Sequence, residues 1–142
     1  MFKKIFKKNN KENGNNKNVL ITALLIHAAK IDDNYTESEK KIIKKAIINL
    51  FSLSEDKAEK ILTKAEEKEQ ESNQIVEFTR EIKKDSMEFR LNIIEILWKI
   101  VYSDGTSNDY ESNLIRRVCG LLYVSDRDSG IIKKKLRPDK II

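Results

Sequence analysis

The sequence predicts an all-α fold, a compact bundle of about seven helices. Two observations indicate this fold. The chain of 142 residues contains one Pro and four Gly, so it has little material for turns, while its 39% hydrophobic content suffices for one core. From Val19 onward, the apolar residues recur with the period of an α-helix. A chain of this length buries roughly two thirds of its unfolded surface, so folding needs neither disulfides nor a metal.

The first three helices are expected over residues 18–30, 37–51 and 55–70. The first has one apolar face, formed by Leu20, Ala23, Leu24 and His27. The second carries a broad apolar stripe, formed by Ile42, Ile43, Ala46, Ile47 and Leu50. The third has a stripe of Ala58, Ile61, Leu62 and Ala65 beside a charged face that includes Glu66, Glu67, Glu69 and Glu71. We expect the stripes to face the core and the charged face to be solvated.

Four further helices are expected over residues 73–83, 87–102, 109–123 and 126–136. The range 87–102 is apolar on nearly all sides, which is typical of a central helix. The last two ranges repeat the patterns of the second and third helices. Pro138 then ends regular structure.

The two halves of the chain resemble each other when the sequence is shifted by 72 residues. Residues 24–33 then lie over residues 96–105, and after a slip of one residue the turn at 53–54 lies over 124–125. Each half reads as a helix, an acidic turn, a helix, a Leu/Val-Ser turn and a third helix. The sequence therefore predicts an internal duplication, with two three-helix repeats joined by the helix at 73–83.

Three parts of the chain differ in composition: a basic amphipathic segment with an Asn-rich flexible linker (1–18), the helical domain (19–137) and a tail (138–142). Residues 1–18 carry six Lys and one Glu, a net charge of +5, and residues 131–142 add +4, which leaves residues 19–130 at −4. A domain that grips phosphates carries its positive charge on a face of the fold. The basic excess lies at the ends instead, which argues against direct nucleic-acid binding.

Each half contains an Asp followed seven positions later by a Glu, as Asp32 with Glu39 and Asp104 with Glu111. The Asp lies in the turn after one helix, and the Glu lies in the first turn of the next. Two carboxylates, turn carbonyls and water would supply oxygen ligands for a divalent cation, calcium or magnesium. The spacing is not that of an EF-hand.

Helix capping is the alternative explanation for both glutamates. Thr36 to Glu39 has the form of a capping box, and Asn108 with Glu111 offers an N-cap and the same third helical position. A cap of this kind contributes roughly 0.5–2 kcal/mol and needs no ion.

The first eight residues place apolar positions on one helical face among four lysines, with the order Phe2, Lys3, Lys4, Ile5, Phe6, Lys7 and Lys8. An anionic lipid surface would stabilise such a helix by burying the apolar side chains and attracting each lysine. A disordered, solubilising start is the alternative. The longest nearly apolar run, residues 19–29, is too short to cross a bilayer.

The candidates for catalysis are few. Cys119 lies among Val118, Leu121 and Leu122 and is expected to be a buried small hydrophobe, and His27 is expected to be a partly exposed or hydrogen-bonded side chain. The single cysteine excludes a multi-thiolate zinc site, and no Walker loop, dinucleotide fingerprint or Ser-His-Asp set is present. We therefore expect no enzyme activity.

Three segments together resemble the TerB family, the tellurite resistance protein B group of bacteria. They are residues 23–33, with Glu39 downstream, residues 95–105, with Tyr110-Glu111, and residues 114–122. The resemblance implies an all-helical fold with two similar halves and acidic residues at Asp32, Glu39, Asp104 and Glu111. It also implies a role in stress and tellurite resistance, with links to metals and membrane complexes and no established catalysis. Ile31-Asp32-Asp33 departs from the family's Ala-Asp-Gly turn, and Ser103 replaces the usual Ala of the second turn.

These observations favour a non-enzymatic interaction module in the cytoplasm, peripheral to the inner membrane face. Its partners would be proteins, including membrane proteins of a stress or tellurite-resistance system, and an anionic membrane surface. The alternative is a divalent-metal-responsive sensor that uses the paired Asp and Glu of the two repeats.

Overall fold

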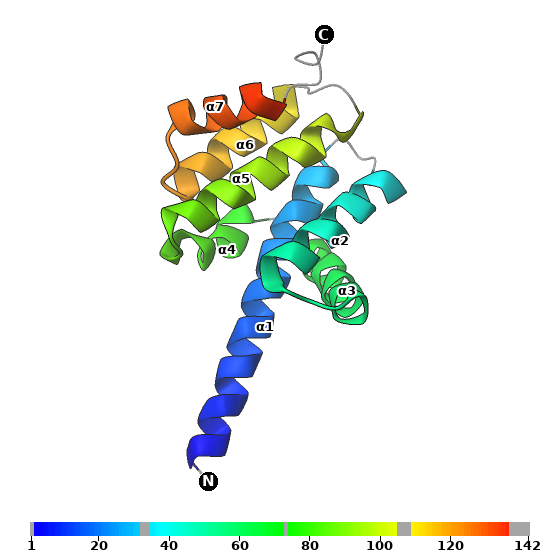
Figure 1. The fold of residues 1–142 in the computed structure, drawn as a ribbon, viewed down its shortest axis with the longest axis vertical. Helices are drawn as coiled ribbons and strands as arrows, with labels where there is room; N and C mark the ends of the chain where they lie inside the picture. The colour runs from blue at the N-terminus through cyan, green and yellow to red at the C-terminus, as the bar shows by residue number, and fades with distance from the viewer. Residues whose placement is uncertain (1, 32–34, 73, 105–108, 137–142) are drawn as a thin grey trace.

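Helices make up the regular structure of the computed structural model, which describes residues 2–31, 35–72, 74–104 and 109–136, with backbone alone at 2–15, 104 and 109–112 (Figure 1). In chain order they are α1 (Phe2–Ala29), α2 (Glu37–Phe51), α3 (Glu55–Glu71), α4 (Ile75–Thr79), η1 (Ile82–Lys84), α5 (Met87–Val101), η2 (Tyr102–Asp104), α6 (Asp109–Leu121) and α7 (Asp126–Leu136), of which η1 and η2 are 3-10 helices. No strand occurs in the described ranges, so the predicted all-α fold is confirmed there.

The first helix is much longer than predicted. We expected a helix over 18–30 preceded by a flexible linker, but α1 begins at Phe2 and continues through the Asn-rich residues, and its N-terminal half projects from the bundle (Figure 1). Extending an existing helix avoids the cost of nucleation. The segment contains no Pro, and each Asn or Gly costs only about 0.7–1 kcal/mol relative to Ala. The linker prediction is therefore corrected.

The centre of the bundle is shared by two helices. The prediction placed residues 87–102 there, and α5 is indeed deeply buried. The C-terminal half of α1 is equally central, because Ile21, Leu24, Leu25 and Ile26 are all fully buried. This half packs against α2, α3, α4 and α5, so it is buried on more sides than the one apolar face that was predicted for it.

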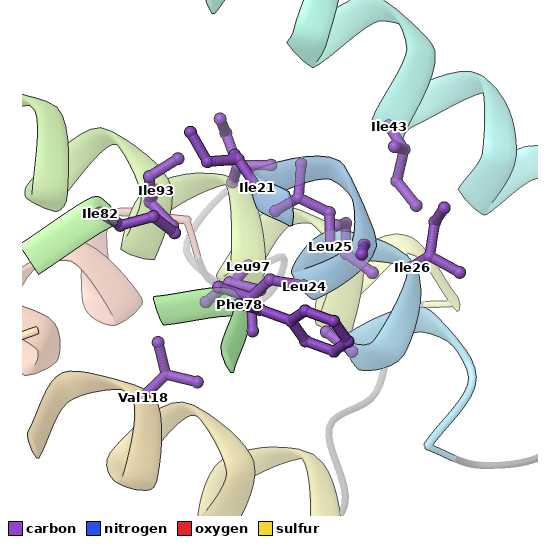
Figure 2. Close-up of a cluster of buried hydrophobic side chains, with 14 of the residues drawn as sticks. Ile21, Leu24, Leu25, Ile26, Ile43, Phe78, Ile82, Ile93, Leu97 and Val118 are labelled. Carbon is purple, nitrogen blue, oxygen red and sulfur yellow. The ribbon is translucent and has the colours of Figure 1, made fainter. Parts of the chain in front are cut away.

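One hydrophobic cluster joins the helices. Figure 2 shows part of it, where side chains of α1, α2, α4, η1, α5 and α6 converge. Phe78 of α4 is its largest fully buried side chain. Burying each such Leu, Ile or Phe contributes about 1.5–3 kcal/mol. This cluster holds the long central helices in fixed positions and thereby places the surfaces between them.

The connecting helix is shorter than the predicted range 73–83. It consists of α4 and the separate turn η1, whose apolar residues Ile75, Phe78 and Ile82 are all buried. In α4 the hydroxyl of Thr79 donates to the carbonyl of Val76 at 3.2 Å, a local bond that competes with continued helix. Three buried anchors within eight residues explain why the segment stays packed although its helix is interrupted.

Two turns, one after α2 and one after α6, have matching geometry. Ser52 and Tyr123 adopt left-handed backbone conformations, with φ of 53° and 57°, and they are the non-glycine residues of positive φ in the described chain. The next residue donates its N–H to the carbonyl five residues earlier, at 3.1 Å for Leu53 and 2.9 Å for Val124. A serine then caps the following helix in both turns, as Ser54 and Ser125.

Candidate functional site

The first acidic turn is described from Tyr35 onward, and its glutamate is part of a helix cap. The Thr36 backbone N–H donates to Oε1 of Glu39 at 2.9 Å, and the Glu39 N–H donates to the Thr36 hydroxyl at 3.1 Å. The Thr36 hydroxyl also donates to Oε1 of Glu39 at 3.0 Å. Glu39 is buried. The predicted capping box is therefore confirmed, and it accounts for one carboxylate oxygen of Glu39.

The structure describes the other proposed cation ligands only in part. Asp32 lies outside the described residues, as does the predicted N-cap Asn108. The backbone places Asp104 at the end of η2 and Glu111 in the first turn of α6, and their side chains lie outside the described part of the chain. Among the described residues, no group of three or more His, Cys, Asp or Glu is arranged to hold a metal ion.

A buried carboxylate joins α1 to α3. Oε2 of Glu69 lies 2.7 Å from Nζ of Lys30, and its Oε1 lies 3.3 Å from Nδ1 of His27. The His27 ring is tilted against the ring of Phe78, with centroids 6.3 Å apart. His27 is thus partly exposed and hydrogen-bonded, as predicted. Removing one partner of a buried pair leaves an uncompensated charge, so this cluster fixes the contact between the two helices.

Glu69 is buried, so the prediction that it lies on a solvated face of its helix is wrong. Helical spacing carried the information: Ala58, Leu62 and Ala65 continue to Glu69 along one side of α3, so Glu69 extends the apolar stripe. The charge of the residue concealed its place on the buried face. Glu66 also has a partner, because its carboxylate lies 3.2 Å from Nζ of Lys40.

A groove that was not predicted from the sequence lies between α2 and α5. Its volume is about 580 Å³, and it is lined by Ile42, Lys45, Ala46, Asn49 and Leu50 of α2 and by Asn92, Glu95, Ile96 and Lys99 of α5. Ile42, Ala46 and Leu50 belong to the apolar stripe that was predicted to face the core. Ile43 and Ile47 of that stripe are buried, whereas Ile42, Ala46 and Leu50 are only partly covered. The apolar stripe of α2 is therefore wider than the part of it that the neighbouring helices cover.

The family described as "Tellurite resistance protein TerB" has a model that matches residues 18–134. The chain belongs to the TerB family. The matched range begins where α1 enters the bundle, at the first buried residues, and ends within α7. The projecting part of α1 therefore precedes the TerB domain. A search of curated proteins and a search of solved structures found no match to the chain.

The one cysteine of the TerB domain is packed against a small polar group. Cys119 is buried, as predicted, and burial raises the pKa of its thiol above the ordinary value, with a smaller opposing effect from a hydrogen bond to Ser129. Ser129 also accepts the indole N–H of Trp98 at 3.1 Å. A thiol held protonated in this way is a poor nucleophile.

The described helices of this TerB protein include none that is long and apolar enough to span a bilayer.

Proposed function

We propose that this TerB protein is a non-enzymatic interaction module of a tellurite-resistance or stress system that attaches reversibly to the inner membrane face through residues 1–8. Its membership of the TerB family supports the link to tellurite resistance. The continuous helix from Phe2 to Ala29 is the observation that supports the attachment.

The helical backbone of α1 is what makes the N-terminal segment suitable for a membrane surface. Helical spacing puts positions 2, 5 and 6 on one face, and Lys occupies positions 3, 4, 7 and 8 around them. An isolated helix of eight residues is unstable in water, but here the helix is already nucleated by the buried half of α1.

The distance from the bundle also suits this role. Nζ of Lys17 forms an ion pair of 2.9 Å with Asp85, where α1 meets the rest of the fold. Fifteen residues separate positions 2 and 17, which corresponds to about 22 Å of helix. The amphipathic end can therefore lie on a membrane while the bundle remains in water.

Co-sedimentation with vesicles tests this proposal. The full chain should pellet with vesicles that contain anionic lipid and should remain in solution with neutral vesicles, because the lysines supply part of the attraction. Replacing Lys3, Lys4, Lys7 and Lys8 with Gln should abolish pelleting. The control replaces four exposed lysines of the bundle, Lys57, Lys60, Lys64 and Lys83. Equal pelleting of both variants, or of a chain lacking residues 1–8, would refute the attachment.

The alternative is a divalent-cation sensor that uses Asp32, Glu39, Asp104 and Glu111. The position of Asp104 at the end of η2 and of Glu111 in the first turn of the next helix, α6, supports it. Titration with calcium, magnesium, manganese and zinc, followed by calorimetry, should give a saturable signal that Asp104→Asn with Glu111→Gln removes. A signal unchanged in that variant would refute this alternative.

We also infer that the fold arose by internal duplication. The matched turns at Ser52 and Tyr123 support this inference, because they lie 71 residues apart, which is the register obtained after the one-residue slip. Superposition of α1–α3 on α5–α7 in an experimental structure tests it.

A further inference from the structure

The groove between α2 and α5 combines an apolar floor with a basic rim. We propose that it is the docking site for an amphipathic helix of a partner protein whose apolar stripe is flanked by Asp and Glu. This inference deepens the proposed interaction role and rests on it, but it does not depend on membrane attachment by residues 1–8.

The floor has the shape that a helix recognises. Ile42, Ala46 and Leu50 follow one another at four-residue intervals along α2, and Ile96 of α5 lies across from them. Eight residues of helix span about 12 Å, so the floor is long enough for two turns of a third helix. Side chains spaced by three and four residues on such a helix would fill the groove and cover the partly exposed stripe.

The lysines of α2 divide into two groups. Lys40 and Lys44 form ion pairs with Glu66 and Glu59 of α3, at 3.2 and 3.0 Å. Lys45 lines the groove, is exposed and forms no ion pair with the residues that the structure describes. It is therefore available for a carboxylate of another molecule.

The opposite wall adds a second cation. Lys99 of α5 is exposed and likewise has no ion pair within the described chain, while Glu95 is the single acidic residue of the lining. Two ammonium groups against one carboxylate give the rim a net positive charge. An acidic helix is attracted to such a rim, and a basic one is repelled.

Charge and shape also select among occupants. The N-terminal segment of a second copy is apolar enough, but its four lysines would meet the lysines of the rim. A bilayer is flat on this scale, whereas the apolar residues here line a concave groove. A separate helix of acidic, amphipathic character fits both properties.

Peptide binding tests the proposal. The probe is a fluorescein-labelled helical peptide of three to four turns with Leu on one face and Glu on both flanks, and its counterpart carries Lys in place of every Glu. The full chain should bind the acidic peptide, by anisotropy, at least about tenfold more tightly than the basic one. Amide NMR shifts caused by the acidic peptide should cluster on α2 and α5.

Matched charge reversals locate the site. Lys45→Glu with Lys99→Glu should weaken the acidic peptide by about tenfold or more and strengthen the basic one. The control, Lys60→Glu with Lys64→Glu, changes the net charge equally on the exposed face of α3 and should leave both affinities unchanged. Ala46→Arg should block the floor while circular dichroism confirms that the helix content is retained.

Three results would overturn the proposal: equal affinity for the two peptides, equal loss in the two double variants, or absence of saturable binding. Vesicle pelleting provides a separate readout. If Lys45→Glu with Lys99→Glu abolishes pelleting and neither peptide binds, the groove faces lipid and the proposed occupant is wrong. If peptide binding behaves as expected and pelleting fails, the membrane attachment alone is refuted.

Discussion

Nζ of Lys30, the residue that follows α1, lies 2.7 Å from the buried carboxylate of Glu69 in the last turn of α3. The two residues are 39 positions apart in the sequence, and α2 lies between α1 and α3 along the chain. The carboxylate has His27 as a second partner, so both of its oxygens are engaged. Lys30 is two residues before Asp32 in the sequence. The pair holds the end of α1 against α3.

Replacing Glu69 with Gln should destabilise the fold. The substitution removes the negative charge that pairs with Lys30 and changes the hydrogen-bond partner of His27. Both residues are partly exposed, so we expect a loss of about 2 kcal/mol, below the value for fully buried pairs. Urea unfolding monitored by circular dichroism measures it. Glu67→Gln, two positions away on the exposed face, should change the free energy by less than about 0.5 kcal/mol. Equal effects would show that the ion pair contributes no stability.

Replacing Tyr123 with Gly should stabilise the protein by about 0.5–1 kcal/mol. Tyr123 has a φ of 57°, which costs a residue with a side chain more than it costs glycine. Its side chain is 69% exposed, so little packing is lost. The melting temperature provides the measurement, and Tyr123→Val should lower it because a β-branched residue fits this conformation poorly. A lower melting temperature for the Gly variant would contradict the argument.

Replacing Thr36 with Ala should cost about 1 kcal/mol, since it removes the hydroxyl that accepts the Glu39 N–H. Chemical unfolding measures the difference. Ser38→Ala, at an exposed position in the same turn, is the matched control and should be near neutral. Addition of calcium or magnesium should not restore the stability of the Thr36 variant if the role of Glu39 is capping alone.

Cys119 should react with thiol reagents only when the fold opens. Burial raises the pKa of its thiol, so the native protein keeps the proton at pH values where an unfolded cysteine loses it. Because the native state binds more protons in that interval, stability should fall as the pH rises above the ordinary cysteine pKa. The rate of modification at pH 8, with and without urea, tests the first point. Rapid labelling of the native protein would contradict it.

Much of the fold is predictable from periodicity. The bounds of α2 and α7 agree with the ranges 37–51 and 126–136, because each helix begins directly after an N-cap residue, Thr36 or Ser125. The start of α1 was not predictable in the same way. Asn-rich sequence has a weak preference for helix, and its conformation depends on a helix that is already formed next to it.

The surfaces depend on tertiary packing and were harder to predict. The stripe of α2 was recognised, but whether Ile42 and Ala46 are covered depends on how closely α5 approaches, which local sequence does not encode. Glu69 shows the opposite case. Its position on the buried side of α3 was present in the spacing, and only a view of Lys30 and His27 explains how a charge is accommodated there.

Because α1 is one continuous helix, the N-terminal segment is a rigid extension of the bundle and not a flexible linker. In a helix, each added residue advances the end by about 1.5 Å and turns it by about 100°. The direction in which positions 2, 5 and 6 face is thus locked to the orientation of Ile21 and Leu24 inside the bundle. A surface that binds the N-terminal segment would consequently fix the orientation of the whole molecule. It would also fix the direction in which the groove between α2 and α5 opens.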